Sequence, residues 1–350
     1  MKESIIPHSR PTISETDIQV VSQVLKSGNI AQGEHVGNFE KSLSTFIGHK
    51  GGIATNSGSS ALHLALIALK ISKGDEVALP SFVCTAPLNA IKYVGAMPLL
   101  IDINPETMNM DFANLKRKIN PETKAIILPH MFGLPADVDE IMEFEKPLIE
   151  DCAHSLGAKY VDERVGSFGI LSIFSFYATK MISTGEGGMI TSASLDLVEN
   201  IKDLRDYDKK EEWKVRYNYK MTDFQAAMGL SQLSKLPEFV QKRREIAKLY
   251  NQEFKDLPIE TPKEYDDRNH IFYRYIIKVD KNLLGIRKRL MDEGIICERP
   301  VYKPLHQYLD NRECLSAQRT WNRSLSIPIY PSLTDNEIER IISSVKRIFV

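Results

Sequence analysis

The sequence predicts an α/β protein with a mostly parallel sheet between helices, followed by a smaller C-terminal α+β domain. Short apolar runs alternate with segments of helical length, which is typical of parallel strands joined by crossover helices. The texture changes near residue 235, where a long and highly charged helical pattern begins. We therefore expect a large domain at 1–238 and a small domain at 239–350.

The first helix is expected at 14–27, where apolar residues recur with helical spacing at Ile18, Val21, Val24 and Leu25. Ser14 stands at the N-cap position and Gly28 lies just past the last turn. Further along, "NSGSSALHLALIALKI" (56–71) combines a glycine/serine turn with a strongly apolar helix.

Apolar runs mark six expected strands: 76–80, 97–103, 124–132, 146–153, 172–178 and 188–193. Too few residues separate the last two runs for a helical crossover, so we expect these two strands to pair antiparallel.

The C-terminal region is expected to contain a helix at 237–254, a strand at 272–279, and helices at 282–294 and 333–349. In the last of these, Thr334 and Glu337 have capping-box spacing, and the apolar positions are Ile338, Ile341, Ile342 and Val345.

Charge and cysteine content exclude several classes of partner. Lys and Arg number 45 against 46 Asp and Glu, which gives no reason to expect nucleic acid or an acidic membrane surface as a partner. The N-terminus lacks a signal-peptide core, and the longest apolar stretch, 61–71, is too short to span a bilayer. The cysteines lack metal-binding spacing: Cys84, Cys152, Cys297 and Cys314. We expect a soluble cytoplasmic protein with free thiols and no metal.

Lys180 stands between a buried strand pattern, "IFSFYA", and a glycine-rich turn, "STGEGG". A solvated surface lysine is the usual case. Here the turn brings backbone close to a neighbouring group, and the apolar run places the lysine near the core. The flanks therefore favour an amine placed for chemistry.

Two other features suggest a ligand site. Asp151 ends a buried strand pattern, where a carboxylate needs a cationic or hydrogen-bonding partner; a structural Asp that caps the next turn is an equally good interpretation of that position alone. The turn "NSGSS" (56–60) could hold an anion at a helix N-terminus, although such caps are common in helices that bind nothing. It is neither a P-loop nor a dinucleotide fingerprint.

Together, an anion site at Ser59 and Ser60, a carboxylate at Asp151 and an amine at Lys180 are the set that pyridoxal phosphate needs. Its phosphate needs hydrogen-bond donors, its ring nitrogen an acidic partner, and its aldehyde a lysine. Lysine suits the last role because its amine changes protonation state readily, whereas arginine stays charged.

With these motifs the sequence resembles the DegT/DnrJ/StrS-type sugar aminotransferases, which are pyridoxal phosphate enzymes of fold type I in the aspartate-aminotransferase superfamily. The most specific matching segments are "NSGSSALHLALIAL", "GDEVALPSF", "EDCAHSLGA", "FSFYATKMISTGEGGMI" and "YNYKMTDFQAAMGLSQL". The resemblance implies a large pyridoxal-phosphate-binding domain with a mixed, mostly parallel seven-stranded sheet.

The resemblance also implies roles for single residues. Lys180 bonds to the cofactor aldehyde and later moves a proton between substrate and cofactor. Asp151 pairs with the protonated ring nitrogen. His154 approaches the ring hydroxyl, although a lone histidine would more often be a packing residue.

Gly58, Ser59, Ser60 and Ser175 are expected to hold the phosphate by the same resemblance. Asn218, in "YNYKM", is similar to an asparagine that reaches the phosphate of the neighbouring subunit. The expected assembly is therefore an obligate homodimer with composite active sites.

Cys84 stands in "PSFVCTAP" where family members often have an aromatic residue stacked on the cofactor ring, so Cys84 is expected beside that ring. The segment "RPVYKPLH" (299–306) resembles the segment that closes over the substrate. It makes Tyr302 and His306 weaker candidates for substrate contacts, with loop packing as the equal alternative.

The resemblance implies an aminotransferase that moves an amino group from L-glutamate to a keto sugar, in the biosynthesis of amino sugars for surface polysaccharides, glycans or antibiotics. We expect a nucleotide-linked 4-keto-6-deoxy sugar as the acceptor. The alternatives are a 3-keto sugar, a cyclitol or an aminobenzoate precursor as the acceptor, a sugar dehydratase, and a non-catalytic cofactor-binding regulator. Lys180 argues against the dehydratases, which have histidine at that position.

Overall fold

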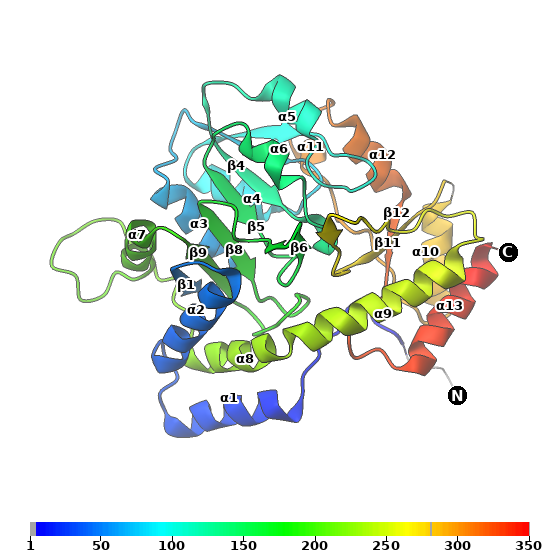
Figure 1. Cartoon of the computed structure of the whole chain (residues 1–350), viewed down its shortest axis with the longest axis horizontal. Coiled ribbons are helices and arrows are strands. Elements are labelled where there is room, and N and C mark those ends of the chain that lie inside the picture. The colour runs from blue at the N-terminus through cyan, green and yellow to red at the C-terminus, as the bar shows by residue number, and fades with distance from the viewer. Residues whose placement is uncertain (1–4, 281, 350) are drawn as a thin grey trace.

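A central sheet with helices on both faces forms most of the molecule, and the C-terminal elements lie beside it (Figure 1). The computed structural model describes residues 5–280 and 282–349. The strands of the central sheet are β1 (Gly51–Thr55), β2 (Glu76–Pro80), β3 (Met97–Ile101), β4 (Thr123–Pro129), β5 (Leu148–Asp151), β8 (Leu171–Ser175) and β9 (Gly188–Ser192). This confirms the α/β class and the seven-stranded sheet.

The seven strands have the order β1-β9-β8-β5-β4-β2-β3. β9 pairs antiparallel with β8 and with β1, and all other pairs are parallel. The expected antiparallel pairing of 172–178 with 188–193 is therefore confirmed. Since β5 and β8 are adjacent and parallel, their last residues, Asp151 and Ser175, lie at the same edge of the sheet.

β1 was not among the six strands predicted from the sequence. Its sequence, "GGIAT", begins with two glycines and is too short to show an apolar period. Its place beside β9 depends on pairing with a strand more than a hundred residues later, with Ile53 opposite Ile190. No local pattern encodes that pairing.

Both faces of the sheet are covered by apolar layers, as expected for a parallel sheet. Ile127 of β4 belongs to the core cluster that includes residues of α3, α4 and α7. Its neighbours Ile126 and Leu128 point the other way, into the cluster with residues of α2 and α8. The helices of this region are α1 (Glu15–Ser27), α2 (Glu34–Ile47), α3 (Gly58–Ala68), α4 (Thr85–Tyr93), α5 (Phe112–Lys118), α6 (Val138–Met142), α7 (Leu195–Arg205) and α8 (Asp223–Ser234), with a 3₁₀ turn at Met131–Gly133.

The predicted ends of α1 are confirmed. Ser14 is the N-cap, its backbone N–H donates to Asp17 Oδ2 over 2.8 Å, and Gly28 closes the helix with a φ of 75°. The expected apolar face is only partly buried: Val24 is buried, whereas Ile18 and Leu25 are exposed.

The C-terminal elements are α9 (Leu236–Phe254), β10 (Arg268–Asn269), β11 (Tyr275–Lys278), α10 (Leu283–Asp292), α11 (Leu305–Tyr308), α12 (Leu315–Arg323), β12 (Ser324–Ile327) and α13 (Asp335–Phe349). α9 extends from α8 to the region of α13 (Figure 1). β11 pairs with β12, and β10 joins β6 (Lys159–Tyr160) and β7 (Glu163–Arg164) in a small sheet. The predicted boundary between residues 238 and 239 falls inside α9, and the division into two domains stays a prediction.

At α13 the capping box is present, because Thr334 N donates to Glu337 Oε2 over 2.9 Å and Glu337 N donates to Thr334 Oγ1 over 3.2 Å. The predicted apolar positions of this helix are all buried: Ile338, Ile341, Ile342 and Val345.

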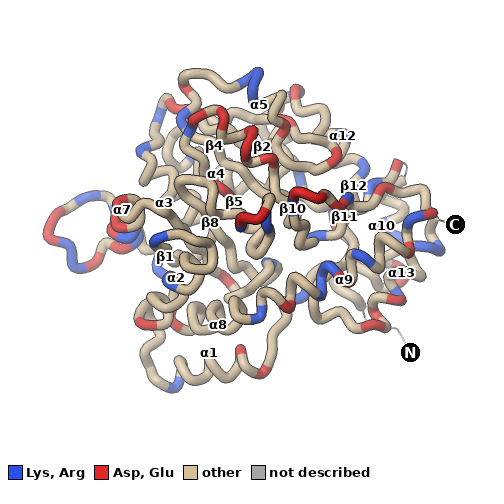
Figure 2. The backbone as a smooth tube through the Cα atoms, in the orientation of Figure 1, with Lys and Arg blue, Asp and Glu red and all other residues tan. Residues whose placement is uncertain are grey.

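Acidic and basic residues are interspersed along the chain (Figure 2). The loop that follows α7, for example, carries both signs. Among the described helices, none combines the length and the apolar content that a membrane crossing requires.

Candidate active site

A cavity of about 400 Å³ lies at the carboxyl ends of β4, β5 and β8, next to the N-terminus of α3. Most of the predicted site residues line it: Gly58, Ser59, Cys84, Asp151, His154, Ser175, Lys180 and Tyr302. The structure therefore brings together residues from five separate segments of the chain. Parallel strands place their carboxyl ends at one edge of a sheet, which explains this convergence.

Lys180 follows β8 in a turn whose backbone is held by a hydrogen bond from Lys180 N to Tyr177 O over 2.9 Å. Its side chain is partly buried and lines the cavity. Within residues 5–280 and 282–349, Lys180 Nζ forms neither a hydrogen bond nor an ion pair; it lies 5.4 Å from the ring centroid of Tyr273. Lys180 thus offers the cavity an amine that contacts only the Tyr273 ring and has no hydrogen bond or ion pair among the described residues.

Asp151, the last residue of β5, also lines the cavity. Its Oδ1 accepts a hydrogen bond from Ala153 N over 3.0 Å, which is the bond expected of a turn-capping Asp. Burial raises the pKa of Asp151, and the hydrogen bond from Ala153 and the positive charge of Lys180 oppose that rise. With one hydrogen bond and no ion pair in the described part of the chain, the carboxylate can accept a further cationic or N–H partner.

His154 lies between two aromatic rings. Its ring centroid is 4.4 Å from that of Tyr273 and 5.8 Å from that of Phe132, with interplanar angles of 21° and 20°. Burial lowers the pKa of His154 well below its usual value, and the charges of Lys180 and Arg274 lower it further. The imidazole is therefore neutral at physiological pH.

The N-terminus of α3 presents donors to the same cavity. Ser57 caps the helix and accepts from Ser60 N over 3.1 Å, whereas the N–H groups of Gly58 and Ser59 lie in the first turn and have no intrahelical acceptor. A Cβ atom at Gly58 would lie 2.9 Å from Ser175 Cβ, so glycine is what lets the helix approach β8 this closely. The N–H groups of Gly58 and Ser59 and the hydroxyls of Ser59 and Ser175 can bind an anion.

Ser60, Asn218 and His306 do not line the cavity. Ser60 Oγ donates to Asn56 Oδ1 over 2.6 Å. Asn218 is exposed, and its two neighbours in the sequence, Tyr217 and Tyr219, stack on each other.

His306 is buried with Ser81 Oγ 2.6 Å from its Nδ1 and Gln318 Oε1 3.0 Å from its Nε2, which is the contact pattern of a packing residue. Tyr302, by contrast, lines the cavity and is 87% exposed.

Sequence reasoning missed Phe132 and Tyr273, which hold His154 between them. Phe132 lies in the 3₁₀ turn after β4, and Tyr273 lies in the segment before β11. Both segments were expected as strands, and a strand pattern does not indicate which remote ring it will contact.

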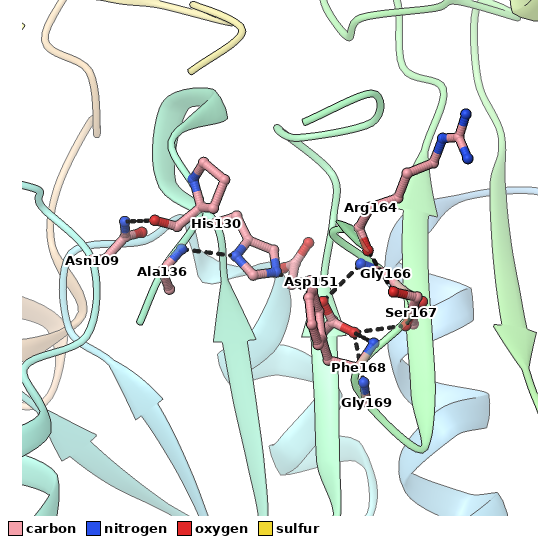
Figure 3. Close-up of polar contacts among 12 residues, drawn as sticks. Asn109, His130, Ala136, Asp151, Arg164, Gly166, Ser167, Phe168 and Gly169 are labelled. Carbon is pink, nitrogen blue, oxygen red and sulfur yellow. Dashed lines mark hydrogen bonds and ion pairs between the residues drawn. The ribbon is translucent and has the colours of Figure 1, made fainter. Parts of the chain in front are cut away.

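A buried polar network lies behind Asp151. Glu150 precedes Asp151 on β5, so its side chain points to the opposite face of the sheet. Its carboxylate accepts backbone hydrogen bonds from Gly166, Phe168 and Gly169 over 2.7, 2.8 and 2.6 Å (Figure 3). Burial disfavours the ionised carboxylate of Glu150 and would raise its pKa. The hydrogen bonds from His130 and these N–H groups nevertheless hold the pKa of Glu150 below its usual value.

His130, Glu150 and Cys152 place possible metal ligands within 4.8 Å of one another. Both oxygens of Glu150 already accept hydrogen bonds, and His130 Nδ1 accepts from Ala136 N over 3.0 Å. Burial raises the pKa of the Cys152 thiol well above its usual value. The donor set is therefore committed to the protein's own groups, and the cluster is structural.

A larger cavity, of about 760 Å³, shares Met131 with the first one. Several of its charged lining residues are engaged in ion pairs: Lys263 with Glu106, and Lys278 and Arg323 with Glu260. This larger cavity lacks the combination of a free amine, a buried carboxylate and a helix N-terminus that distinguishes the smaller cavity.

Comparisons with known proteins agree on one family. The model of the DegT/DnrJ/EryC1/StrS aminotransferase family matches residues 11–346. GDP-perosamine synthase of Caulobacter vibrioides is 35% identical over 337 residues, which cover 91% of each chain. The crystal structure of the aminotransferase TlmJ from Streptoalloteichus hindustanus matches with a TM-score of 0.93 and 28% identity, over 98% of each chain. Spr1654 of Streptococcus pneumoniae, 28% identical, matches in its PLP-form with a TM-score of 0.91 over 98% of each chain, and in its PMP-form with 0.92 over 98% of this chain and 97% of that one.

Proposed function

This chain belongs to the DegT/DnrJ/EryC1/StrS aminotransferase family, and we propose that it transfers an amino group from L-glutamate to a nucleotide-linked keto sugar. It is an aminotransferase, and its cofactor is pyridoxal 5′-phosphate. The observation that carries the proposal is the pairing, in one cavity, of the free amine of Lys180 with the singly hydrogen-bonded carboxylate of Asp151.

The residues around the cavity fit the cofactor. The N–H groups of Gly58 and Ser59 and the hydroxyls of Ser59 and Ser175 match a phosphate. Asp151 matches the protonated ring nitrogen, because a carboxylate in a buried site favours a cationic partner. When bound, pyridoxal phosphate supplies an electron sink for the charge that develops at the carbon bearing the amino group.

Each residue then has a defined task. Lys180 Nζ would hold the cofactor by its aldehyde and, once released, would carry the proton between Cα of the amino donor and the cofactor. Asp151 would keep the ring nitrogen protonated. His154 would present a neutral imidazole to the ring hydroxyl, Cys84 would face the ring, and Tyr302 would contact the substrate at the exposed mouth.

We assign the functional unit as a homodimer with composite sites. The loop after α7 projects from the rest of the chain (Figure 1) and exposes 91% of Trp213 and 61% of Val215. α1 exposes Ile18 and Leu25. A second copy would cover these apolar side chains. Asn218, at the base of the projecting loop, would then reach the phosphate in the neighbouring subunit.

The acceptor is proposed to be a 4-keto-6-deoxy sugar. A relative named GDP-perosamine synthase supports a nucleotide-linked substrate.

We also propose that the enzyme is cytoplasmic. This is supported by the four cysteines, which are all free thiols: Cys84, Cys152, Cys297 and Cys314.

A substrate panel tests this proposal. The purified protein is incubated with L-glutamate and UDP-, GDP- or dTDP-linked 4-keto and 3-keto sugars, and aminated products are detected by mass spectrometry. We expect amination of one 4-keto sugar and none with the Lys180→Ala variant. If only a 3-keto sugar is aminated, the acceptor is a 3-keto sugar and not a 4-keto sugar. If a cyclitol is aminated but no nucleotide sugar is, the proposed class of acceptor is wrong.

A further inference from the structure

Tyr273 is a buried residue from the C-terminal elements that reaches the candidate active site. It is 4% exposed and precedes β11. The backbone around it is fixed by the buried guanidinium of Arg243, whose NH1 donates to the carbonyl oxygens of Phe272, Tyr273 and Ile329 over 3.3, 3.2 and 2.7 Å. Three carbonyl acceptors on one guanidinium hold this segment against α9.

The same segment meets the turn after β4 at very close range. Ile271 N donates to Gly133 O over 3.0 Å. Gly133 has a φ of 93°, and a Cβ atom there would lie 2.9 Å from Tyr273 N. Phe132, the preceding residue, also has a left-handed φ, of 57°. Strain of this kind persists only where surrounding contacts hold it.

Those surrounding contacts come from the buried polar network (Figure 3). Met131 N donates to Asn109 Oδ1 over 2.7 Å, and Asn109 Nδ2 donates to Leu134 O over 3.1 Å. His130 Nδ1 accepts from Ala136 N. Hydrogen bonds therefore hold the turn that carries Phe132 from both sides. Phe132 and Tyr273 are thereby fixed in position against the His154 ring.

The hydroxyl of Tyr273 contacts the residue next to Lys180. Its Oη lies 3.2 Å from Thr179 Oγ1 and accepts from Arg274 NH2 over 3.3 Å. Thr179 and Lys180 both line the cavity, and Lys180 Nζ lies over the Tyr273 ring. Burial would raise the pKa of Tyr273, but the charges of Lys180 and Arg274 and the hydrogen bond with Thr179 lower it to about 8.

We propose that Tyr273 is a positioning residue, which fixes the Lys180 turn through Thr179 and the His154 ring by stacking. This inference rests on the proposed function of the cavity. It makes the placement of the amine and of the imidazole depend on a side chain of the C-terminal elements, so that the reactive groups are aligned only when those elements are docked. Alignment matters because a displacement of about 1 Å can slow a reaction about a hundredfold.

The test uses holoenzyme carrying Tyr273→Phe, Thr179→Val or both changes. Tyr273→Phe keeps the ring and removes the hydroxyl, and Thr179→Val removes its partner with little change in shape. We expect each single change to lower the limiting single-turnover rate of the half-reaction with glutamate about tenfold, to change the glutamate concentration that gives half of that rate by no more than about twofold, and to halve the visible circular dichroism of the bound cofactor. The double variant should be no slower than the worse single variant, because both remove one contact.

Tyr275→Phe is the matched control. Tyr275 is a second buried tyrosine two residues away, and its hydroxyl donates to Asn251 Oδ1 over 2.6 Å, in the cluster of the C-terminal elements. It should lower the thermal midpoint while it leaves the cofactor dichroism and the half-reaction unchanged.

The outcomes separate this inference from the proposed function. Wild-type protein that binds no pyridoxal phosphate, or whose visible band does not bleach with glutamate, contradicts the proposed function. If the wild-type protein bleaches but Tyr273→Phe equals Tyr275→Phe in dichroism and in the rate of the half-reaction, the inference is overturned. Fully additive effects of Tyr273→Phe and Thr179→Val overturn it too. A fifth variant, Tyr273→Leu, removes the stacking ring and should weaken cofactor binding to the apoprotein about tenfold more than Tyr273→Phe does. Equal affinities would contradict the stacking role.

Discussion

His130 Nε2 lies 3.0 Å from Glu150 Oε1, and both side chains are fully buried. Since His130 Nδ1 accepts from Ala136 N, the ring carries its proton on Nε2 and donates it to the carboxylate. This bond ties the end of β4 to β5 one residue before Asp151. The edge of the sheet that carries Asp151 is therefore braced by a buried charged group on the opposite face.

Removal of the Glu150 carboxylate should destabilise the protein strongly. Glu150→Ala leaves three backbone N–H groups and the His130 donor without an acceptor, and we expect a loss of about 3–5 kcal/mol in the free energy of unfolding. Glu150→Gln keeps the shape and one acceptor oxygen, so its loss should be smaller. Urea denaturation followed by circular dichroism measures both values. A Glu150→Ala variant within about 0.5 kcal/mol of wild type would show that the network carries no stability.

Asp151→Asn should abolish most turnover without unfolding the protein. Asparagine keeps the size of the side chain and can accept from Ala153 N, but it cannot pair as an anion with a protonated ring nitrogen. We expect kcat to fall by at least about a hundredfold, since removal of one such electrostatic partner costs that much in other enzymes. Steady-state kinetics with glutamate and a keto sugar that the wild-type protein aminates measure the loss of turnover, and a thermal melt checks that the variant stays folded. Near-normal turnover would refute the pairing.

Asn218→Ala tests the composite site. Asn218 is exposed and lies outside the cavity of its own chain, so its effect should be exerted on the neighbouring subunit. The variant should retain cofactor poorly, and Lys180→Ala should be inactive. When the two variants are unfolded and refolded together, mixed dimers should regain activity, because one site then combines an intact Lys180 with an intact Asn218. Absence of complementation, or a fully active monomer in analytical ultracentrifugation, would contradict the assignment.

Asp17 should make folding stability depend on pH in the acid range. It is buried, and Lys235 Nζ lies 2.8 Å from its Oδ1. Burial disfavours the ionised carboxylate and would raise its pKa, but the hydrogen bonds from Lys235 and Ser14 hold the pKa of Asp17 at about 2. Because this value is below that of the unfolded chain, about 3.9, the stabilisation is complete above pH 4 to 5 and is lost as the pH falls towards 2.

The expected contribution is about 2 kcal/mol. Denaturation curves of wild type and Asp17→Asn at pH 6 and at pH 3 measure it. The difference between the two proteins should shrink at the lower pH; a difference that stays constant would show that Asp17 does not titrate with folding.

The outline of the fold could be predicted because its signals are local. Ser14, Gly28 and Thr334 mark helix ends through hydrogen bonds to residues within four positions. The short segment between β8 and β9 leaves only antiparallel pairing. β1 escaped prediction because its strand character depends on a partner far along the chain.

The same distinction applies to the site. Asp151, Ser175 and Lys180 could be predicted to meet because parallel strands end at one edge. Tyr273 could not, since its place beside Lys180 depends on how the C-terminal elements dock. For His306 the motif left a substrate contact and loop packing equally open. Its hydrogen bonds to Ser81 and Gln318 favour packing.

The most direct measurement of the central claim is borohydride reduction of the holoenzyme followed by peptide mass spectrometry. A free, partly buried amine in the cavity should carry the cofactor, so the reduced pyridoxyl group should be found on the peptide that contains Lys180. Prior addition of glutamate without an acceptor should remove most of the label, because the cofactor then leaves the lysine. Lys180→Ala should carry no label. A label on another lysine, or an unchanged label on the Lys180→Ala protein, would contradict the account.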